Sequence, residues 1–283
     1  DIKIGFESTA HYALNLELFL ENAHHSFMEV NPVLIKEYKK STTLRRTKTD
    51  SVDCESIARW LITVEYKPHS KGFYHAYSLK SLTRLRDRLI RQRSFYLVKI
   101  TNVLDHTFPE FKPFFNERLS KTALYLLENY GSAEKMARMN SASYDKLRCI
   151  SRGKFSIQQF LRLKELAANT VGVNNSIFDL ELNTLLTLYK SLSDEINTLE
   201  TEIIKLIEEV HPHYMSIPGI GPISAAVIYA EYGDISNFSN PGQMLAFAGI
   251  EPGINDSGTE SHGGRMVKHG SSQLRYVLLN SCL

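Results

Sequence analysis

Three acidic side chains stand where a metal-dependent reaction could use them. Glu7 ends a short apolar segment that reads as a β-strand, and active-site residues gather at the carboxyl ends of parallel strands. Asp50 and Asp53 are three residues apart in the predicted first turn of a helix, so their carboxylates share one face. Oxygen ligands of this kind suit Mg²⁺ or Mn²⁺. The alternative is structural, because acidic residues in a first turn also interact favourably with the helix dipole.

A serine in a glycine-rich segment is the candidate nucleophile. Ser257 lies in the sequence Asn-Asp-Ser-Gly, within a predicted flexible loop that continues through Gly263 and Gly264. A serine hydroxyl can attack a phosphodiester when neighbouring cations neutralise the developing charge and another group removes its proton. A serine beside glycine is by default a turn residue. Three neighbours compete for the catalytic role: Ser261, Ser271 and Ser272.

A turn of glycine and proline at residues 217–222 predicts a contact with nucleic acid. Gly219 and Gly221 let the backbone turn tightly, and the helix that follows presents unpaired N–H groups to an anion. Helix, turn and helix together resemble a helix-hairpin-helix, which holds nucleic-acid backbones without reading their sequence. The alternative is an ordinary joint between two helices, with glycine at a C-cap and proline at the first helical position.

The chain as a whole is close to neutral, so a nucleic-acid surface must come from local clusters. Its 283 residues carry a formal net charge of +2, with 43% hydrophobic and 23% charged residues, as in a folded protein of two or three domains. Three basic clusters are candidates for binding nucleic acid. One holds Lys39, Lys40, Arg45, Arg46 and Lys48, and another holds Arg265, Lys268, His269 and Arg275. The third is an arginine-rich helix over 79–104. A solvated face is the more ordinary use of such clusters.

The remaining composition excludes other classes of protein. Three cysteines without C-x-x-C spacing argue against a disulfide framework or a zinc site and favour a reducing compartment. No apolar run reaches membrane-spanning length, and the sequence contains no signal peptide. We therefore expect a cytoplasmic protein without membrane contact.

The elements that must position the acidic residues alternate between strand and helix. The predicted segments follow in this order: strand 2–6, helix 9–23, strand 25–30, helix 32–40 and helix 50–62. Alternation of this kind predicts a largely parallel sheet. Mixed helical segments from 106 to 175 follow, and we find no chemistry in them.

A regular heptad pattern begins at Leu182. One seam position is occupied by residues seven apart: Leu182, Tyr189, Ile196, Ile203 and Val210. Leucines fill the other seam position: Leu185, Leu192, Leu199 and Leu206. Four heptads predict a coiled coil through which copies of the chain associate. Packing against a second helix of the same chain is the alternative.

Five segments in a fixed order resemble one family. They are Phe-Glu-Ser-Thr-Ala-His-Tyr at 6–12, Val-Asn-Pro at 30–32, Lys-Thr-Asp-Ser-Val-Asp at 48–53, Ile-Pro-Gly-Ile-Gly-Pro at 217–222, and Ala-Phe-Ala-Gly-Ile-Glu-Pro at 246–252 followed by Asn-Asp-Ser-Gly. The family is that of the insertion-sequence transposases with a RuvC-like D-E-D-D domain and a C-terminal serine domain. Its relatives include the pilin-gene invertase and the bridge-RNA-guided recombinases.

The resemblance implies a fold of class α/β plus α in three domains. Residues 1–106 are expected to form an RNase H-like (RuvC-like) domain that lacks its first strands. Residues 107–213 are expected to form a helical linker and coiled coil. Residues 214–283 are expected to form a helical serine transposase domain with a helix-hairpin-helix.

The resemblance also implies roles for individual residues. Glu7 matches the glutamate of the tetrad, and Asp50 and Asp53 match its last two aspartates, which bind Mg²⁺ or Mn²⁺. Ser257 matches the serine that attacks DNA and forms a covalent phosphoserine link. Members of the family recognise DNA through a structured guide RNA where this is known. They work as dimers or tetramers held partly by a coiled coil, and Leu182–Val210 matches this element.

One departure from the family pattern matters. The first aspartate of the tetrad has no counterpart, since Asp1 precedes the strand of Glu7 too closely. Both ends of the chain look cut, and we expect a truncated or decayed copy with little strand exchange. Three functions stay open: a serine recombinase, a metal-dependent RuvC-like nuclease that uses water, and an inactive DNA-binding remnant.

Overall fold

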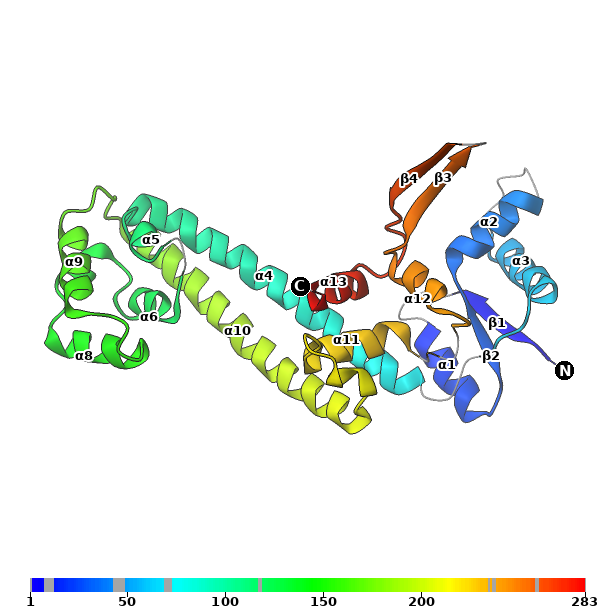
Figure 1. Cartoon of the computed structure of the whole chain (residues 1–283). Helices are drawn as coiled ribbons and strands as arrows, with labels where there is room; N and C mark the ends of the chain where they lie inside the picture. The colour runs from blue at the N-terminus through cyan, green and yellow to red at the C-terminus, as the bar shows by residue number, and fades with distance from the viewer. Residues whose placement is uncertain are drawn as a thin grey trace. The chain divides into compact units, whose positions relative to one another are not determined.

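The chain divides into two units. The structure, a computed structural model, describes residues 2–7, 13–42, 49–68, 73–116, 119–233, 235, 238–257 and 260–282. Contacts between residues group 1–76 with 233–239 as the first unit, and 77–232 with 240–283 as the second. Each unit is described by itself (Figure 1).

The first unit alternates strands and helices as predicted. Its elements are β1 (Ile4–Glu7), α1 (Ala13–Asn22), β2 (Phe27–Val30), α2 (Pro32–Thr42) and α3 (Asp50–Thr63). The two strands pair in parallel, with Ile4 opposite Phe27 and Glu7 opposite Val30. The prediction of a parallel sheet is therefore confirmed for these strands.

Helix α3 covers one face of this sheet and runs against the direction of β1. A Cβ atom added to Gly5 would lie 2.5 Å from Leu61 Cδ1, so the glycine lets α3 approach the strand closely. At the far end of α3, Lys3 Nζ donates to the Leu61 carbonyl, and Tyr66 Oη accepts from Ile4 N at 3.3 Å. The end of α3 therefore lies at the start of β1, and the first turn of α3 lies toward the carboxyl ends of the strands.

The second unit is helical apart from one hairpin (Figure 1). A long helix, α4 (Phe73–Thr107), enters it from the first unit. The other elements are α5 (Phe111–Phe114), α6 (Lys121–Tyr130), α7 (Ala133–Ala137), α8 (Ser141–Ile150), α9 (Ile157–Ala168), α10 (Ser176–Val210), η2 (His213–Ser216), α11 (Pro222–Tyr232), α12 (Pro241–Ala248), β3 (Pro252–Ser257), β4 (Glu260–Met266) and α13 (Ser272–Ser281).

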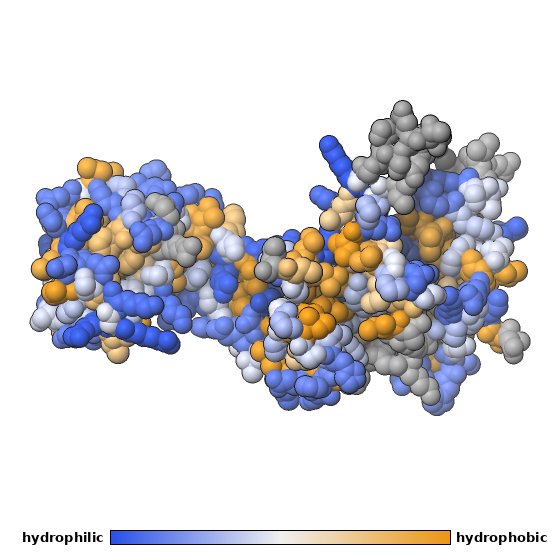
Figure 2. Space-filling view, viewed as in Figure 1, coloured by the Kyte–Doolittle hydropathy of each residue, from blue (hydrophilic) through white to orange (hydrophobic). Residues whose placement is uncertain are grey.

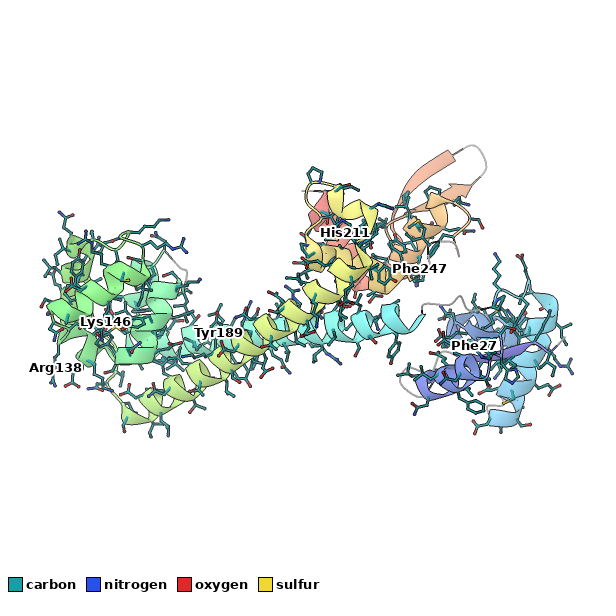
Figure 3. The ribbon with its side chains drawn as sticks, turned by 90° about the horizontal axis from the view of Figure 1, so that it is seen from below. Phe27, Arg138, Lys146, Tyr189, His211 and Phe247 are labelled. Atoms are coloured by element: carbon teal, nitrogen blue, oxygen red, sulfur yellow. The ribbon has the colours of Figure 1, made fainter. Side chains whose placement is uncertain are left out.

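Two apolar clusters hold α4 and α10 together near their ends. The larger cluster joins Ile100 and Leu104 of α4 to Leu182 and Leu186 of α10, and helices α5–α9 complete it. Tyr189, labelled in Figure 3, packs against this cluster. The second cluster joins Leu79 of α4 to residues of α10 and α11. Helices α4 and α10 thus form an intramolecular pair, and α5–α9 form a helical tip at one end of it.

This packing bears on the predicted coiled coil. The heptad segment is one continuous helix of 35 residues, as expected. However, Leu182, Ile196 and Ile203 of the seam are already buried within a single chain. The physical reason is that α4 and α11 supply the apolar surface that a second copy was expected to provide. The structure favours the intramolecular alternative over association through Leu182–Val210.

Apolar surface remains exposed around the C-terminal helices. Figure 2 shows apolar colour concentrated there. Leu245 and Phe247 of α12 and Leu279 of α13 contribute to it. Within the described part of the chain, no helix combines the length and the apolar character needed to cross a membrane.

Candidate functional site

The three predicted acidic residues lie on two elements of the first unit, β1 and α3. Glu7 is the last residue of β1, and it lies on the same side of the sheet as Gly5 because alternate residues of a strand face the same way. Helix α3 covers that side, and its first turn carries Asp50 and Asp53. The structure thus has Glu7 at a strand end and Asp50 and Asp53 in a first helical turn, as predicted, while their meeting at one site stays a prediction.

The first turn of α3 is built by its own sequence. Thr49 is the N-cap, and its side chain accepts a hydrogen bond from Val52 N at 3.4 Å. Asp50 is exposed beyond this cap, and Asp53 follows one turn later, where its backbone N–H donates to the Thr49 carbonyl at 3.0 Å. Both carboxylates also interact favourably with the helix dipole, so the structural alternative holds at the same time.

The Asp53 carboxylate is already paired with a cation of the protein. Lys39 Nζ, from the last turn of α2, makes an ion pair with Asp53 Oδ1. This oxygen is shielded from solvent and receives no hydrogen bond of ordinary geometry, so the ammonium is its partner. The side chains of Lys39 and Asp53 are 23% and 25% exposed, which makes the pair partly buried.

The predicted metal site is not seen among the described residues. In that part of the chain, no group of three or more His, Cys, Asp or Glu side chains is placed to hold a metal ion. Lys39 lies beside the Asp53 carboxylate instead. The role of Glu7, Asp50 and Asp53 as metal ligands therefore stays a prediction.

A buried carboxylate on α1 was missed by the sequence reasoning. Glu17 is only 3% exposed, and its Oε2 has no hydrogen-bond partner. Burial, followed by repulsion from Glu29 and Glu21, raises the pKa of Glu17 to about 7. The signal in the sequence was an acidic residue at helical spacing between Ala13 and Leu20, both of which are buried.

Ser257 lies at the distal end of a two-stranded ribbon. Strands β3 and β4 pair antiparallel, with Pro252 opposite Met266 at the base and Ser257 opposite Glu260 at the far end. The expected loop is therefore corrected to two paired strands over the described residues 252–257 and 260–266. A Cβ atom added to Gly264 would lie 2.1 Å from the Gly253 carbonyl oxygen, so glycine lets the strands pass close together.

The competing serines differ in their surroundings. Ser271 is the N-cap of α13 and accepts a hydrogen bond from Leu274 N at 3.2 Å. Ser271 also donates to the buried carboxylate of Glu231, which places it in a structural role. Ser272 is exposed in the first turn of α13, and Ser261 lies opposite Asp256 in the hairpin. The role of Ser257 itself stays a prediction.

The predicted basic residues divide into free and engaged ones. Arg265, Lys268 and His269 are exposed. Arg275 instead donates from Nη1 to the Ala248 carbonyl at 3.2 Å, and so ties α13 to the end of α12. Three residues of another predicted cluster lie outside the described residues: Arg45, Arg46 and Lys48.

The arginine-rich helix α4 uses several of its charges inside the chain. Arg84 Nε donates to Glu231 Oε1 at 2.9 Å, and Arg86 pairs with Glu200 of α10 at 2.5 Å. Burial alone would raise the pKa of Glu231, but hydrogen bonds and charges from Arg84 and Lys80 lower it. These arginines therefore connect α4 to α10 and α11.

In the turn before α11, the backbone conformation and packing explain one of the two glycines. Gly219 has a φ of +94°, and an added Cβ would lie 2.8 Å from the Ser281 carbonyl oxygen of α13. Gly221 faces open space, with nothing within 4 Å of an added Cβ. Only the Gly221 side of the turn is thus open to a ligand, and the helix-hairpin-helix stays a prediction.

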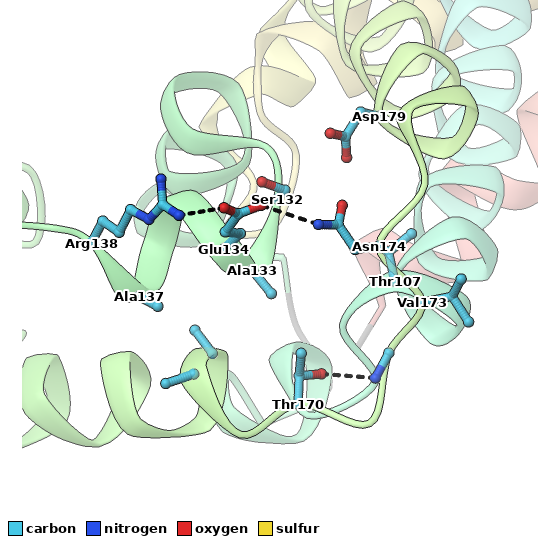
Figure 4. A pocket seen from close by; sticks show the side chains of 13 residues that line it. Thr107, Ser132, Ala133, Glu134, Ala137, Arg138, Thr170, Val173, Asn174 and Asp179 are labelled. Carbon is cyan, nitrogen blue, oxygen red and sulfur yellow. Dashed lines mark hydrogen bonds and ion pairs between the residues drawn. The ribbon is translucent and has the colours of Figure 1, made fainter.

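A cavity lies in the helical tip, far in sequence from all of these residues. Its volume is about 350 Å³, and α7 and the connection between α9 and α10 line it (Figure 4). Glu134 pairs there with Arg138 at 2.5 Å and accepts from Asn174 at 3.0 Å. These three polar side chains of the lining are therefore engaged in the protein's own contacts.

Comparison with known proteins identifies the family. Residues 1–109 match a family model for transposases of the IS110 DEDD type, and residues 212–283 match the "Transposase IS116/IS110/IS902 family". The chain belongs to the IS110/IS116 transposase family. Glu7, Asp50 and Asp53 lie in the first matched segment and Ser257 in the second, whereas α5–α10 lie in neither.

Individual relatives support the same assignment to the transposase family. The chain is 25% identical over 253 residues to the "Transposase for insertion sequence element IS1111A" of Coxiella burnetii, which covers 89% of this chain and 57% of the relative. It is 28% identical over 192 residues to the "Insertion element IS110 uncharacterized 43.6 kDa protein" of Streptomyces coelicolor, covering 65% and 46%. The chain thus spans about half the length of each of these relatives.

Proposed function

We propose that this chain carries out transposition chemistry on DNA, with Ser257 as the nucleophile. The observation that carries the proposal is where the candidate residues fall in the family matches. In one matched segment, acidic residues lie at the end of a strand and at the start of a helix. In the other, a serine lies at the end of a two-stranded ribbon. A serine at the end of a projecting ribbon could reach a phosphate in DNA.

The proposed step is an exchange of one phosphodiester for another. The Ser257 oxygen forms a bond to phosphorus, and the bond from phosphorus to a deoxyribose oxygen breaks. The serine proton passes to a base, and the departing deoxyribose oxygen takes up a proton. Rejoining is the reverse reaction with a different deoxyribose hydroxyl, so no external energy source is needed. The exposed cations Arg265 and Lys268 lie on the same hairpin or directly after it and are the proposed phosphate ligands.

The other participants are proposed from family membership. A divalent cation, Mg²⁺ or Mn²⁺, is the cofactor that a DEDD domain implies, with Glu7, Asp50 and Asp53 as its proposed ligands. Arg45, Arg46, Lys48, Gly219 and Gly221 are proposed to contact nucleic acid. A structured guide RNA and a dimeric or tetrameric assembly rest on the resemblance alone.

A second candidate is an inactive remnant that still binds DNA. The ion pair of Lys39 with Asp53, and the absence of a converged acidic group among the described residues, favour it. The two candidates differ in whether DNA becomes attached to protein.

The test is incubation of the chain with labelled DNA that carries the element's ends, with and without Mg²⁺, read on a denaturing gel. We expect label that migrates with the protein, lost in Ser257→Ala and retained in Ser272→Ala, its exposed control. Attachment that survives in Ser257→Ala would transfer the role to another serine. Free cleaved DNA indicates a nuclease that uses water, and binding without cleavage indicates the remnant.

A further inference from the structure

Positive charge is concentrated in residues 119–175, the part of the helical tip that holds α6–α9. This segment contains nine lysines and arginines against four aspartates and glutamates, a net charge of +5, although the whole chain has a net charge of only +2. Two of the four acidic residues already have a cation beside them: Glu134 pairs with Arg138 at 2.5 Å, and Glu128 lies 3.9 Å from Lys190. The rest of the chain is therefore net negative, and the tip is a local positive region.

Four of these cations lie within nine residues, and we call residues 146–154 the basic turn. Lys146 and Arg148 stand on α8, and Arg152 and Lys154 lie between α8 and α9. All four are exposed, and Figure 3 labels Lys146 in the tip. Asp145, the one acidic residue of α8, makes no ion pair with them, and within the described part of the chain nothing else engages their side chains. The four charges are thus available to a ligand.

The backbone of the basic turn is fixed to the tip. The N–H groups of residues 151–155 all donate within the tip, and the Gly153 N–H closes α8 by donating to the Arg148 carbonyl at 2.8 Å. Leu147 and Phe155, on either side of the turn, are 0% and 5% exposed and belong to the larger apolar cluster. The cations therefore stand on a well-anchored segment, and a ligand can meet only their side chains.

Local structure disfavours two of these cations. Arg152 has a φ of +54°, in the left-handed region where glycine is the usual residue after a helix. Lys154 comes two residues before Ser156, the N-cap of α9, and a cation near a helix N-terminus interacts unfavourably with the helix dipole. The dipole of α8 accounts for Arg148 in its last turn, but no contact among the described residues accounts for a cation at 152 or 154. A ligand of opposite charge does account for them.

We propose that the basic turn binds the phosphate backbone of duplex DNA. The chain belongs to a transposase family, and a DNA duplex offers one negative charge per about 1.7 Å of its axis, so several cations in one short segment can each meet a phosphate. Such contacts position DNA without reading its sequence. The inference goes beyond the proposed function, because the basic turn lies in neither matched family segment and holds none of the proposed reacting residues.

The first experiment measures DNA binding by the full chain with fluorescence anisotropy. The probe is a labelled duplex of mixed sequence, without Mg²⁺, so that no chemistry at Ser257 is involved. The turn variant removes all four charges: Lys146→Gln, Arg148→Gln, Arg152→Gly and Lys154→Gln. We expect its affinity to fall at least about tenfold, and the slope of log affinity against log salt to decrease by about 3–4.

The control variant loses the same number of charges from exposed lysines outside the tip: Lys36→Gln, Lys99→Gln, Lys190→Gln and Lys205→Gln. We expect its salt slope to stay within about 1 of that of the unchanged chain. An equal loss of affinity in the two variants would show that only net charge matters, and would overturn the inference.

The single substitution Arg152→Gly separates binding from folding. Glycine adopts the left-handed conformation at a lower cost than arginine, so we expect the melting temperature to stay the same or rise. We expect DNA affinity to fall severalfold in the same variant. A lower melting temperature with unchanged DNA affinity would make the turn purely structural and would overturn the inference.

The second experiment uses the unchanged chain, so it does not depend on whether a variant folds. Lysines are acetylated with N-acetoxysuccinimide, and the labelled sites are quantified by mass spectrometry with and without the DNA duplex. We expect DNA to protect Lys146 and Lys154 severalfold and to leave Lys205 unchanged. Equal labelling of all three with and without DNA contradicts the inference.

Two further probes test the choice of DNA as the partner. Dependence on the basic turn for a duplex of RNA but not of DNA would make RNA the partner, and displacement of DNA by an equal charge of poly-L-glutamate would make the turn a general anion surface; either result overturns the inference. DNA binding that depends on the turn, in a chain that never becomes attached to DNA, contradicts the role of Ser257 alone.

Discussion

Two regions hold their candidate reactive groups in different ways. One is the acidic edge, meaning Glu7, Asp50 and Asp53 of the first unit, and the other is the serine ribbon of residues 252–266. At the acidic edge, the carboxylates stand on regular elements, and an ion pair from a neighbouring helix restrains one of them. In the ribbon, the restraint is steric, because Gly253 and Gly264 let two strands approach more closely than any side chain permits. The cation of an ion pair can be replaced by another cation, whereas a steric restraint between two backbones has no such substitute.

The largest effect is expected where shape restrains the ribbon. In Gly264→Ala, the new Cβ would overlap the Gly253 carbonyl, so the strands must separate at a cost of about 3 kcal/mol. We expect amide exchange in residues 252–257 to become about a hundredfold faster, and DNA attachment through Ser257 to fall with it. Hydrogen exchange followed by mass spectrometry measures the first, and the gel assay the second.

The control for this substitution is Gly221→Ala, whose added Cβ meets nothing within 4 Å. It leaves exchange in residues 252–257 unchanged. If Gly264→Ala also leaves the exchange unchanged, the ribbon does not depend on close approach, and the contrast with the acidic edge is lost.

The next effect concerns charge in the first unit. Burial raises the pKa of Glu17 from 4.5 to about 7. Between pH 4.5 and about 7, the folded protein therefore keeps a proton on Glu17 that the unfolded chain has lost. Stability is therefore fully present below about pH 4.5 and is lost as the pH rises through about 7. We expect Glu17→Gln to stabilise the protein by about 2–3 kcal/mol at pH 8 and by almost nothing at pH 4.5.

Thermal unfolding at pH 4.5, 6 and 8 checks this prediction. Glu65→Gln, which removes a carboxylate whose side chain is 81% exposed, is the control and is expected to change stability little at any of these pH values. A gain in Glu17→Gln that is the same at every pH would mean that burial of the charge is not the cause.

The same contrast explains what the sequence could and could not predict. The end of β1 at Glu7 and the start of α3 at Asp50 follow from local patterns, namely an apolar strand and a threonine cap. The pairing of Lys39 with Asp53 joins residues 14 apart through packing of α2 on α3, which no local pattern specifies. The elements were therefore predictable, and the electrostatic state of the acidic edge was not.

The C-terminal residues show the same limit for glycine and arginine. Both types are used for binding phosphate and for internal packing, and the sequence does not distinguish the two uses. Gly219 is explained by the approach of Ser281, and Arg275 by its bond to Ala248. Likewise, the heptads of α10 predicted a long apolar seam but not that α4 of the same chain covers it.

The smallest effect separates packing from binding among the basic residues. Arg275→Met loses the bond to the Ala248 carbonyl, so we expect stability to fall by about 1 kcal/mol with little change in DNA affinity. Arg265→Met removes an exposed charge, so we expect stability to change by less than about 0.5 kcal/mol. If Arg265 contacts a phosphate, DNA affinity falls in this variant, and the slope of log affinity against log salt decreases by about 1. Thermal unfolding and DNA titrations at several salt concentrations measure both quantities. The reverse result, with Arg275→Met weakening DNA binding at unchanged stability, would make Arg275 a DNA ligand and would remove the distinction between engaged and free cations.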